Sequence, residues 1–140
     1  MKILVVDDDP TICDMLKILL STKGHQVNTY LDPTATPIIQ ERENNCSRGS
    51  HCADAMLVDY FMPNMNGLEF LKLLEKRGCG AVRGNKAMIT AYDTCELRQE
   101  LDRLGIKCFH KPFKLPEINQ WLEDCATRVA QEGEKQSQLM

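Results

Sequence analysis

The sequence predicts an α/β fold in which helices cover both faces of a parallel β-sheet. Short apolar runs rich in β-branched residues alternate along the chain with segments whose apolar residues recur every three or four positions. Five such strand and helix pairs follow one another within 140 residues, the length of one typical domain. Alternating strands and helices form parallel sheets with right-handed crossovers, and no internal repeat or second domain interrupts the pattern.

The first strand and helix have the clearest signals. Residues 3–6 are expected to form a buried strand, and Asp9 with Pro10 supplies an N-cap and a proline for the first helical turn. Apolar residues at i, i+3, i+4, i+7 and i+8 then form one face of a helix that Gly24 ends. These apolar residues are Ile12, Met15, Leu16, Leu19 and Leu20.

The next segment combines a strand, a weaker helix and an irregular loop. Residues 26–30 have the pattern of a second strand. Residues 33–42 form a weaker helical pattern, because Pro37 removes a backbone donor unless it lies in the first turn. Residues 43–53 show no apolar pattern and are expected to form an exposed loop that is longer than most connections.

Three further strands are expected at residues 55–58, 86–90 and 106–110. A loop with turn-forming residues follows Asp59 and leads into the next helix. The apolar residues of that helix are Leu68, Phe70, Leu71, Leu73 and Leu74. The following helix carries Leu97, Leu101 and Leu104, is capped by Asp93 or Thr94, and ends at Gly105.

The last helix is expected to begin at Pro116. Its apolar face consists of Ile118, Leu122, Cys125 and Val129. Residues 132–140 are polar and are expected to be frayed or disordered. One domain is therefore predicted at residues 1–128, and residues 129–140 are predicted to be the helix end and a disordered tail.

Composition argues against several classes of function. The net charge of -3 and the pI of about 5.6 give no sign of a nucleic-acid-binding surface. No apolar run approaches the roughly 20 residues that span a bilayer, and the N-terminus lacks the features of a signal peptide. The protein is therefore predicted to be cytoplasmic, without contact to membrane or nucleic acid.

The chain has seven cysteines, an odd number, which in a reducing cytosol are expected to be free thiols. Four occupy positions that suit a small packed apolar residue: Cys13, Cys95, Cys108 and Cys125. A group in the irregular loop resembles part of a metal site, but an ordinary polar loop is favoured because structural zinc usually needs four ligands. The group is Cys46, His51 and Cys52.

Polar residues follow the C-terminal ends of four expected strands. Three acids, Asp7, Asp8 and Asp9, follow the first strand. The corresponding residues of the third, fourth and fifth strands are Asp59, Thr90 and Lys111. Ligands of open parallel sheets bind outside these strand ends, so we expect the side chains to converge there.

The convergence favours phosphoryl chemistry. Close carboxylates repel one another unless a cation neutralises them, and Mg²⁺ prefers oxygen ligands shared with phosphate. A carboxylate can accept a phosphoryl group as an aspartyl phosphate, while a lysine and a hydroxyl stabilise the charge. Each residue alone has an ordinary structural explanation, Asp9 as an N-cap above all. Only their combination at corresponding strand ends makes the pattern specific.

Four segments resemble the receiver domain of bacterial response regulators, in the order and spacing of that family. They are residues 3–10 (Ile-Leu-Val-Val-Asp-Asp-Asp-Pro), 58–67 (Val-Asp-Tyr-Phe-Met-Pro-Asn-Met-Asn-Gly), 89–91 (Ile-Thr-Ala) and 111–113 (Lys-Pro-Phe). Each segment is moderately specific, and the four together are highly specific. The resemblance covers about residues 1–128.

The resemblance implies a flavodoxin-like (βα)5 sheet with strand order 2-1-3-4-5. It implies that Asp59 accepts phosphate from a phosphohistidine of a sensor kinase or phosphotransfer protein, and that a downstream protein target reads the result. Asp8, Asp59 and the backbone carbonyl of Phe61 would ligate Mg²⁺ directly, with Asp7 acting mainly through water. A homodimer through the fourth main helix, the fifth strand and the last helix would also fit the family.

The resemblance further implies a switch made of residues after the fourth and fifth strands. Lys111 would pair with the phosphoryl oxygens, and Thr90, followed by Ala91, would move in to hydrogen-bond one of them. The Lys111–Pro112 peptide bond would be cis, which proline permits. Phosphorylation would thus bias an existing equilibrium between two conformations.

This sequence departs from the family pattern in three ways. Cys108 stands where relatives carry a switch aromatic, and strand alternation directs the neighbouring Phe109 to the opposite side. Phe61 and Tyr92 flank the expected site, where bulky rings would hinder water and prolong the life of the phosphoryl group. The loop at residues 43–53 is longer than usual, and a tolerated insertion is favoured over a partner contact.

Two other classes of function stay open. A phosphatase of the haloacid dehalogenase type needs a second aspartate two residues after the nucleophile, where this chain has Phe61. Asp7 and Asp9 have that spacing, but the chain is too short for the usual cap and core. The second alternative is a receiver-like interaction module that works without phosphorylation. The main prediction is a signalling domain that catalyses only its own phosphorylation and dephosphorylation.

Overall fold

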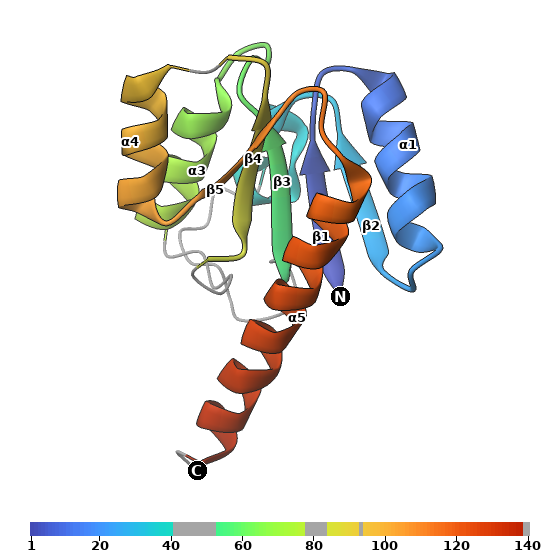
Figure 1. The fold of residues 1–140 in the computed structure, drawn as a ribbon. Helices are drawn as coiled ribbons and strands as arrows, with labels where there is room; N and C mark the ends of the chain where they lie inside the picture. The colour runs from blue at the N-terminus through green and yellow to red at the C-terminus, as the bar shows by residue number, and fades with distance from the viewer. Residues whose placement is uncertain (41–52, 78–83, 93, 139–140) are drawn as a thin grey trace.

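One five-stranded parallel sheet organises the computed structural model, which describes residues 1–40, 53–77, 84–92 and 94–138 (Figure 1). The strand order is β2-β1-β3-β4-β5, as expected. The strands are β1 (Lys2–Val6), β2 (Gln26–Tyr30), β3 (Ala55–Asp59), β4 (Lys86–Thr90) and β5 (Lys107–His110). The helices are α1 (Pro10–Ser21), α2 (Pro37–Gln40), α3 (Gly67–Lys76), α4 (Cys95–Leu104) and α5 (Leu115–Gln138). The predicted flavodoxin-like α/β fold is therefore confirmed.

Helices cover the sheet on both faces, with α1 and α5 on one side and α3 and α4 on the other (Figure 1). Each inner strand has a continuous apolar stretch, and successive side chains of that stretch enter opposite layers. In β1, for example, Ile3 and Val5 pack under α1 and α5, while Leu4 and Val6 pack under α3 and α4. Burial on both faces explains why the strands have continuous apolar runs rather than alternating ones.

The helix ends follow the expected signals. Asp9 caps α1 by accepting a hydrogen bond from the Thr11 N–H, and Pro10 occupies the first turn. Thr94, one of the two candidate caps, accepts the Leu97 N–H at the start of α4. Gly105 ends α4 in the left-handed conformation, at φ 72°, that favours glycine.

The structure corrects two expectations about helices. The weaker helical segment is divided into a short 3-10 turn, Pro33–Ala35, and α2, which begins at Pro37. The tail expected to be frayed or disordered from residue 132 is helical as far as Gln138, because α5 continues in one piece. Strong helix formers such as glutamate, lysine and glutamine dominate that polar stretch, and helix propensity does not require an apolar face.

Other expectations have mixed outcomes. Cys13 and Cys125 are buried and Cys108 is half-buried, but Cys95 is exposed at the first turn of α4 rather than packed. The predicted loop at residues 43–53, with Cys46, His51 and Cys52, lies outside the described residues except for its last position. In the part of the chain that the structure describes, no helix is long and apolar enough to cross a membrane.

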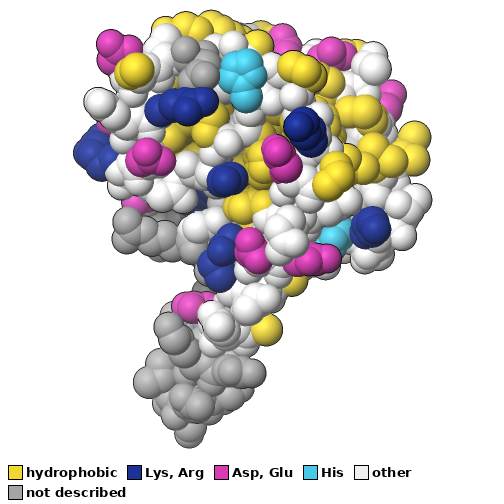
Figure 2. Space-filling view, in the orientation of Figure 1, with side chains coloured by type: hydrophobic (Ala, Val, Ile, Leu, Met, Phe, Trp, Pro, Cys, Tyr) yellow, Lys and Arg dark blue, Asp and Glu magenta, His cyan; other side chains and the backbone are white. Residues whose placement is uncertain are grey.

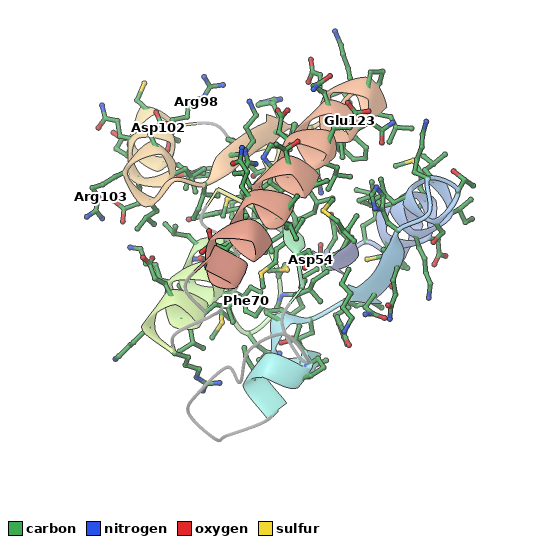
Figure 3. All side chains as sticks on the ribbon, turned by 90° about the horizontal axis from the view of Figure 1, so that it is seen from below. Asp54, Phe70, Arg98, Asp102, Arg103 and Glu123 are labelled. Carbon is green, nitrogen blue, oxygen red and sulfur yellow. The ribbon has the colours of Figure 1, made fainter. Side chains whose placement is uncertain are left out.

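A hydrogen-bonded polar network closes the N-terminal edge of the sheet. The fully buried Asn85 donates from Nδ2 to the carbonyl oxygens of Asp54, 2.9 Å away, and Cys125, 3.3 Å away. Arg128 of α5 donates to Asn85 Oδ1 over 2.7 Å and to the Gly84 carbonyl over 3.1 Å. Figure 3 views this edge from below, with Asp54 labelled near its centre. These bonds fasten α5 to the segments that precede β3 and β4.

Candidate functional site

The polar residues expected to converge do meet at the C-terminal edge of the sheet. The carboxylates of Asp7, Asp8 and Asp59 can place one oxygen each within 4.8 Å of one another. Asp7 and Asp59 are buried, whereas Asp8 is exposed. Lys111, which follows β5, reaches into the same group, and Thr90 ends the neighbouring strand β4. Parallel pairing of β1, β3, β4 and β5 brings these distant parts of the chain together.

Lys111 supplies the positive charge that holds two of the carboxylates. Its Nζ lies 3.2 Å from Asp7 Oδ2 and 3.4 Å from Asp59 Oδ1. Burial lowers the pKa of Lys111, but the two carboxylates outweigh burial and raise that pKa above its usual value. Lys111 is therefore a fixed cation at the site, and the Lys111–Pro112 bond before α5 is cis, as expected.

Asp59 is the carboxylate with the most strongly shifted titration. Burial, together with the nearby charge of Asp7, raises its pKa to about 6, although Lys111 and the Tyr60 N–H counteract the rise. Burial likewise raises the pKa of Asp7 despite the hydrogen bond from the Asp9 N–H and the ion pair with Lys111. One lysine does not balance this group of acids, so it carries excess negative charge.

The donor set fits a hard divalent cation. Mg²⁺ prefers carboxylate and carbonyl oxygens and retains several waters, and the three carboxylates offer such oxygens within one small volume. Asp8 is exposed and open to a hydrated ion, while Asp7 already accepts bonds from Lys111 and the Asp9 N–H. Asp9 itself caps α1 and is excluded from the candidate ligands.

Thr90 lies buried beside the acids, and its hydroxyl oxygen accepts one backbone hydrogen bond. Its Oγ1 accepts the N–H of Tyr92 over 2.9 Å, and its carbonyl accepts the N–H of Lys111 over 2.8 Å. The adjacent Ala91 is exposed. In this conformation the bond ties the hydroxyl oxygen to the loop after β4.

Three aromatic rings form a cluster beside Asp59. The rings of Tyr60 and Tyr92 are stacked, with centroids 5.1 Å apart and an interplanar angle of 15°. Phe61 meets both edge-on, at 4.9 Å from Tyr60 and 5.3 Å from Tyr92. Phe61 is 58% exposed and Tyr92 is 39% exposed, and their expected effect on access to the site stays a prediction. Sequence reasoning missed Tyr60, although its position directly after Asp59 was a usable signal.

A second missed feature is the close approach of α3 to Asp59. A Cβ placed on Gly67 would lie 2.1 Å from the carbonyl oxygen of Asp59, so only glycine fits at this position. The Gly67 N–H donates to the Tyr60 carbonyl over 2.8 Å. Asn66 caps α3 in a capping box with Glu69. The turn residues after β3 therefore hold the start of α3 against the backbone of Asp59.

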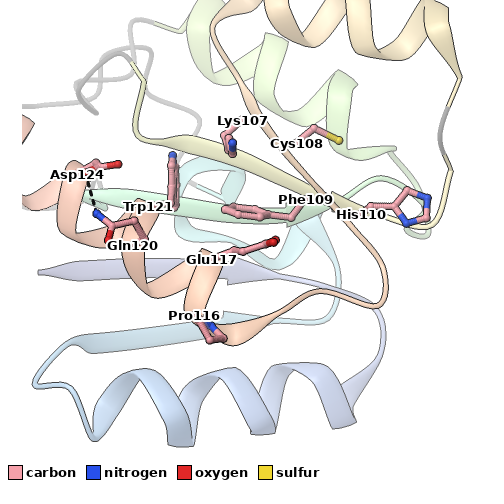
Figure 4. A pocket seen from close by; sticks show the side chains of 9 residues that line it. All are labelled: Lys107, Cys108, Phe109, His110, Pro116, Glu117, Gln120, Trp121 and Asp124. Atoms are coloured by element: carbon pink, nitrogen blue, oxygen red, sulfur yellow. Dashed lines mark hydrogen bonds between the residues drawn. The ribbon is translucent and has the colours of Figure 1, made fainter.

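The aromatic side chain of β5 lies on the opposite face of the strand from Cys108, as strand alternation predicted. Phe109 is buried in the α1 and α5 layer, where its ring meets Trp121 edge-on at 5.8 Å. Cys108 packs against the α3 and α4 layer. Figure 4 shows the two side chains on opposite sides of β5, with Phe109 directed toward Trp121.

Comparison with known proteins decides the family. The family model for the response regulator receiver domain matches residues 3–123. This chain is a response regulator receiver domain. Receiver domains of this family are signalling modules of two-component phosphorelay systems and are generally not true enzymes, and the family interacts with histidine kinases and downstream targets.

The receiver domain resembles curated regulators over part of their length. It is 32% identical over 130 residues to the transcriptional regulatory protein QseB of Escherichia coli, covering 92% of this chain and 54% of that protein. It is 29% identical over 119 residues to the DNA-binding response regulator MtrA of Mycolicibacterium smegmatis, covering 84% of this chain and 46% of that one. The chain thus spans about half the length of these relatives. The expected lack of nucleic-acid contact stays a prediction for these 140 residues.

Solved structures agree with the fold of this receiver domain. A CheY-like receiver domain protein from Methanospirillum hungatei has a TM-score of 0.71 at 26% identity, covering 95% of this chain and 97% of that one. The response regulator TrrA from Thermotoga maritima, solved with Mg²⁺ and BeF, has a TM-score of 0.65 at 25% identity, covering 89% and 97%. The family disfavours the phosphatase alternative and the module without phosphorylation.

Proposed function

We propose that this receiver domain accepts a phosphoryl group on Asp59 in a Mg²⁺-dependent reaction and changes its binding of a downstream protein as a result. The donor is a phosphohistidine on a sensor histidine kinase or a phosphotransfer protein. The observation that carries the proposal is the buried Asp59, which shares an acidic group with Asp7 and Asp8 while Lys111 lies 3.4 Å away. A buried carboxylate with excess negative charge around it and one fixed cation suits phosphoryl transfer, which depends on charge neutralisation.

The transfer exchanges one bond to phosphorus for another. A carboxylate oxygen of Asp59 attacks the phosphorus, the P–N bond of the phosphohistidine breaks, and the imidazole leaves with the electron pair. Asp8, Asp59 and the carbonyl of Phe61 would hold Mg²⁺ directly, and Asp7 would act mainly through water. When bound, the ion would neutralise charge on the carboxylates and the phosphoryl oxygens. The N–H of Tyr60 donates to Asp59 Oδ1 over 2.8 Å and would steady the carboxylate during the transfer.

Two further side chains would receive the phosphoryl oxygens. Lys111 is held between Asp7 and Asp59 and is close enough to pair with an oxygen on the modified carboxylate. Thr90 would turn its hydroxyl from the Tyr92 N–H toward another phosphoryl oxygen. The adjacent Ala91 would belong to the same phosphoryl-binding segment. Such a motion of Thr90 would select one of two conformations that already exist in equilibrium. The phosphoryl charge on Asp59 would in this way change a surface that lies away from it.

The donor has an apolar surface to meet beside the acidic group. A shallow hollow adjoins Lys111 between α1 and the segment before α5, and most of its lining is apolar. The lining residues are Ile12, Met15, Leu19, Lys111, Pro112, Phe113 and Leu115. Figure 2 shows hydrophobic side chains gathered over the side where α1 lies.

Two further proposals concern the cell and the assembly. We propose that the protein acts in the cytoplasm. A homodimer through α4, β5 and α5 stays a prediction.

Intact-mass measurement after incubation with acetyl phosphate and Mg²⁺ tests the proposal. The wild type should gain one phosphoryl group, about 80 Da, and EDTA or Asp59→Asn should abolish the gain. Asp54→Asn is the matched control, because Asp54 precedes the same strand at its opposite end and its side chain accepts the Lys2 N–H there. A folded, Mg²⁺-replete wild type that gains no mass would overturn the proposal in favour of a module that works without phosphorylation.

A further inference from the structure

The aromatic cluster of Tyr60, Phe61 and Tyr92 connects the two loops that carry the acceptor and the switch hydroxyl. We propose that stacking of Tyr92 on Tyr60 is the positioning contact that holds Thr90 in its resting orientation, and that phosphorylation releases it. The inference rests on the proposed function, because it assumes that Asp59 becomes phosphorylated. In relatives an aromatic side chain at the position of Cys108 changes conformation on phosphorylation. The inference assigns that conformational change to the Tyr60, Phe61 and Tyr92 cluster in this chain.

Backbone bonds place both tyrosines directly against the reacting groups. The Tyr60 N–H donates to Asp59 Oδ1 over 2.8 Å, and the Tyr92 N–H donates to Thr90 Oγ1 over 2.9 Å. Each tyrosine therefore holds one polar group of the site with its backbone and meets the other tyrosine with its ring. The stacked rings, with centroids 5.1 Å apart, complete a link from the acceptor to the switch hydroxyl.

The two ends of this link differ in how firmly the chain holds them. The Tyr60 carbonyl accepts the Gly67 N–H over 2.8 Å, and Gly67 lies against the backbone of Asp59. The ring of Tyr60 packs against the buried layer beneath α3 and α4. Tyr92 lies in the loop after β4, next to the exposed Ala91, and is itself 39% exposed. When the link opens, the movement therefore falls on Tyr92.

The position that relatives use for a switch aromatic cannot perform this role here. Cys108 has no ring, and the ring of Phe109 is fixed on the other face of the sheet against Trp121. The Tyr92 N–H donates to Thr90 Oγ1, and rotation of the Thr90 side chain toward a phosphoryl oxygen would carry Oγ1 away from this donor. Loss of that bond frees Tyr92 to leave Tyr60 and Phe61. The exposed face of the cluster is then rebuilt beside the modified Asp59.

Fluorine NMR of chains labelled with 3-fluorotyrosine measures this movement directly. The chain has three tyrosines, so each gives one resonance, and Tyr30 at the end of β2 serves as an internal reference outside the cluster. After treatment with acetyl phosphate and Mg²⁺, with the adduct confirmed by mass, the Tyr92 resonance should move most and Tyr30 least. Phosphorylated Thr90→Val should show no such movement of Tyr92, because the hydroxyl that couples it is absent. An adduct that leaves the wild-type Tyr92 resonance in place would overturn the inference.

Hydrogen exchange tests the coupling without any phosphorylation. Replacing Tyr60 with leucine should speed exchange of the Tyr92 amide by roughly two- to tenfold, the range that loss of one aromatic pair allows. Tyr60→Phe keeps the ring and should leave the exchange rate unchanged. If both variants exchange like the wild type, ring stacking does not hold the Thr90 bond and the inference is wrong. Wild type that gains no phosphoryl mass would instead overturn the proposed function and leave this comparison intact.

Discussion

The two ends of the sheet are built on opposite principles, although both contain buried polar groups. At the N-terminal edge, Asn85 and Arg128 satisfy one another and three carbonyl groups through hydrogen bonds. At the C-terminal edge, Asp7 and Asp59 share a single lysine, and burial together with their mutual repulsion raises the pKa of Asp59 to about 6. One edge fastens the fold, whereas the other holds charge that the protein alone does not balance.

The contrast teaches how to separate structural polar groups from functional ones. Among the described residues, no buried side-chain nitrogen or oxygen lacks a hydrogen-bond partner, so unsatisfied bonds do not distinguish the two edges. Charge does. Buried carboxylates that repel one another destabilise a fold, and chains keep them where a ligand relieves the repulsion. The following variants test the contrast, from the largest expected effect to the smallest.

Breaking the N-terminal network should have the largest effect on stability. Asn85→Ala removes the Nδ2 donor from the carbonyls of Asp54 and Cys125 and the acceptor from the Nε–H of Arg128. We expect a loss of about 3 kcal/mol in the free energy of unfolding, measured by urea denaturation with far-UV circular dichroism. Asn28→Ala, an exposed change of the same type in β2, is the control and should change stability by less than about 0.5 kcal/mol. Equal losses in the free energy of unfolding for the two variants would show that the network does not stabilise the fold.

Removing charge at the C-terminal edge should act in the opposite direction. Asp59→Asn relieves the repulsion with Asp7 and the burial of a charge, and should stabilise the Mg²⁺-free chain at pH 7.5 by about 2 kcal/mol. Urea denaturation in EDTA measures the gain. Saturating Mg²⁺ should shrink it, because the ion stabilises the wild type more. A loss of stability for Asp59→Asn in EDTA would contradict the assignment of excess charge.

The pH dependence sharpens the same comparison. The pKa of Asp59 is about 6 in the folded chain against an ordinary value of 3.8, so the folded state binds more protons between these values. Stability associated with Asp59 is fully present below pH 4 and is lost as the pH rises through 6. The gain from Asp59→Asn should therefore be near zero at about pH 3, partial at about pH 4.5 and greatest above about pH 7. A gain that does not vary with pH would exclude titration of Asp59 as its cause.

The aromatic side chains beside Asp59 should have the smallest effect, on the lifetime of the phosphoryl group. Phe61→Asn and Tyr92→Glu exchange exposed rings for polar groups and should admit water to the aspartyl phosphate. We expect each to speed phosphate release by roughly fivefold, about 1 kcal/mol in the barrier. Phe61→Tyr retains a ring and serves as the control. Release rates equal to the wild type in both polar variants would show that the rings do not limit access of water.

Much of the fold and of the site was predictable because it depends on local pattern. The strands, the caps at Asp9 and Thr94, and the convergence of Asp59 with Lys111 follow from apolar periodicity and from the rule for parallel strand ends. The opposite directions of Cys108 and Phe109 follow from strand alternation. These features need only neighbours in sequence and the topology of the sheet.

The remainder depends on contacts between distant segments. Tyr60 and Tyr92 are 32 positions apart, and their stacking depends on how two loops settle above the sheet. The bond between Arg128 and Asn85 joins residues 43 positions apart through side-chain geometry that no periodic pattern encodes. The extension of α5 to Gln138 was missed for another reason, because a polar segment was read as disordered although its residues favour a helix.

The placement of Trp121 gives the protein two separate optical signals. It is the single tryptophan of the chain, and it lies on the buried face of α5 with its ring against Phe109. Two of the three tyrosines, Tyr60 and Tyr92, stack in the cluster beside Asp59, apart from Trp121. Tryptophan emission should therefore follow unfolding of the α1 and α5 layer and respond little to the switch, whereas tyrosine signals should report the switch while the fold stays intact.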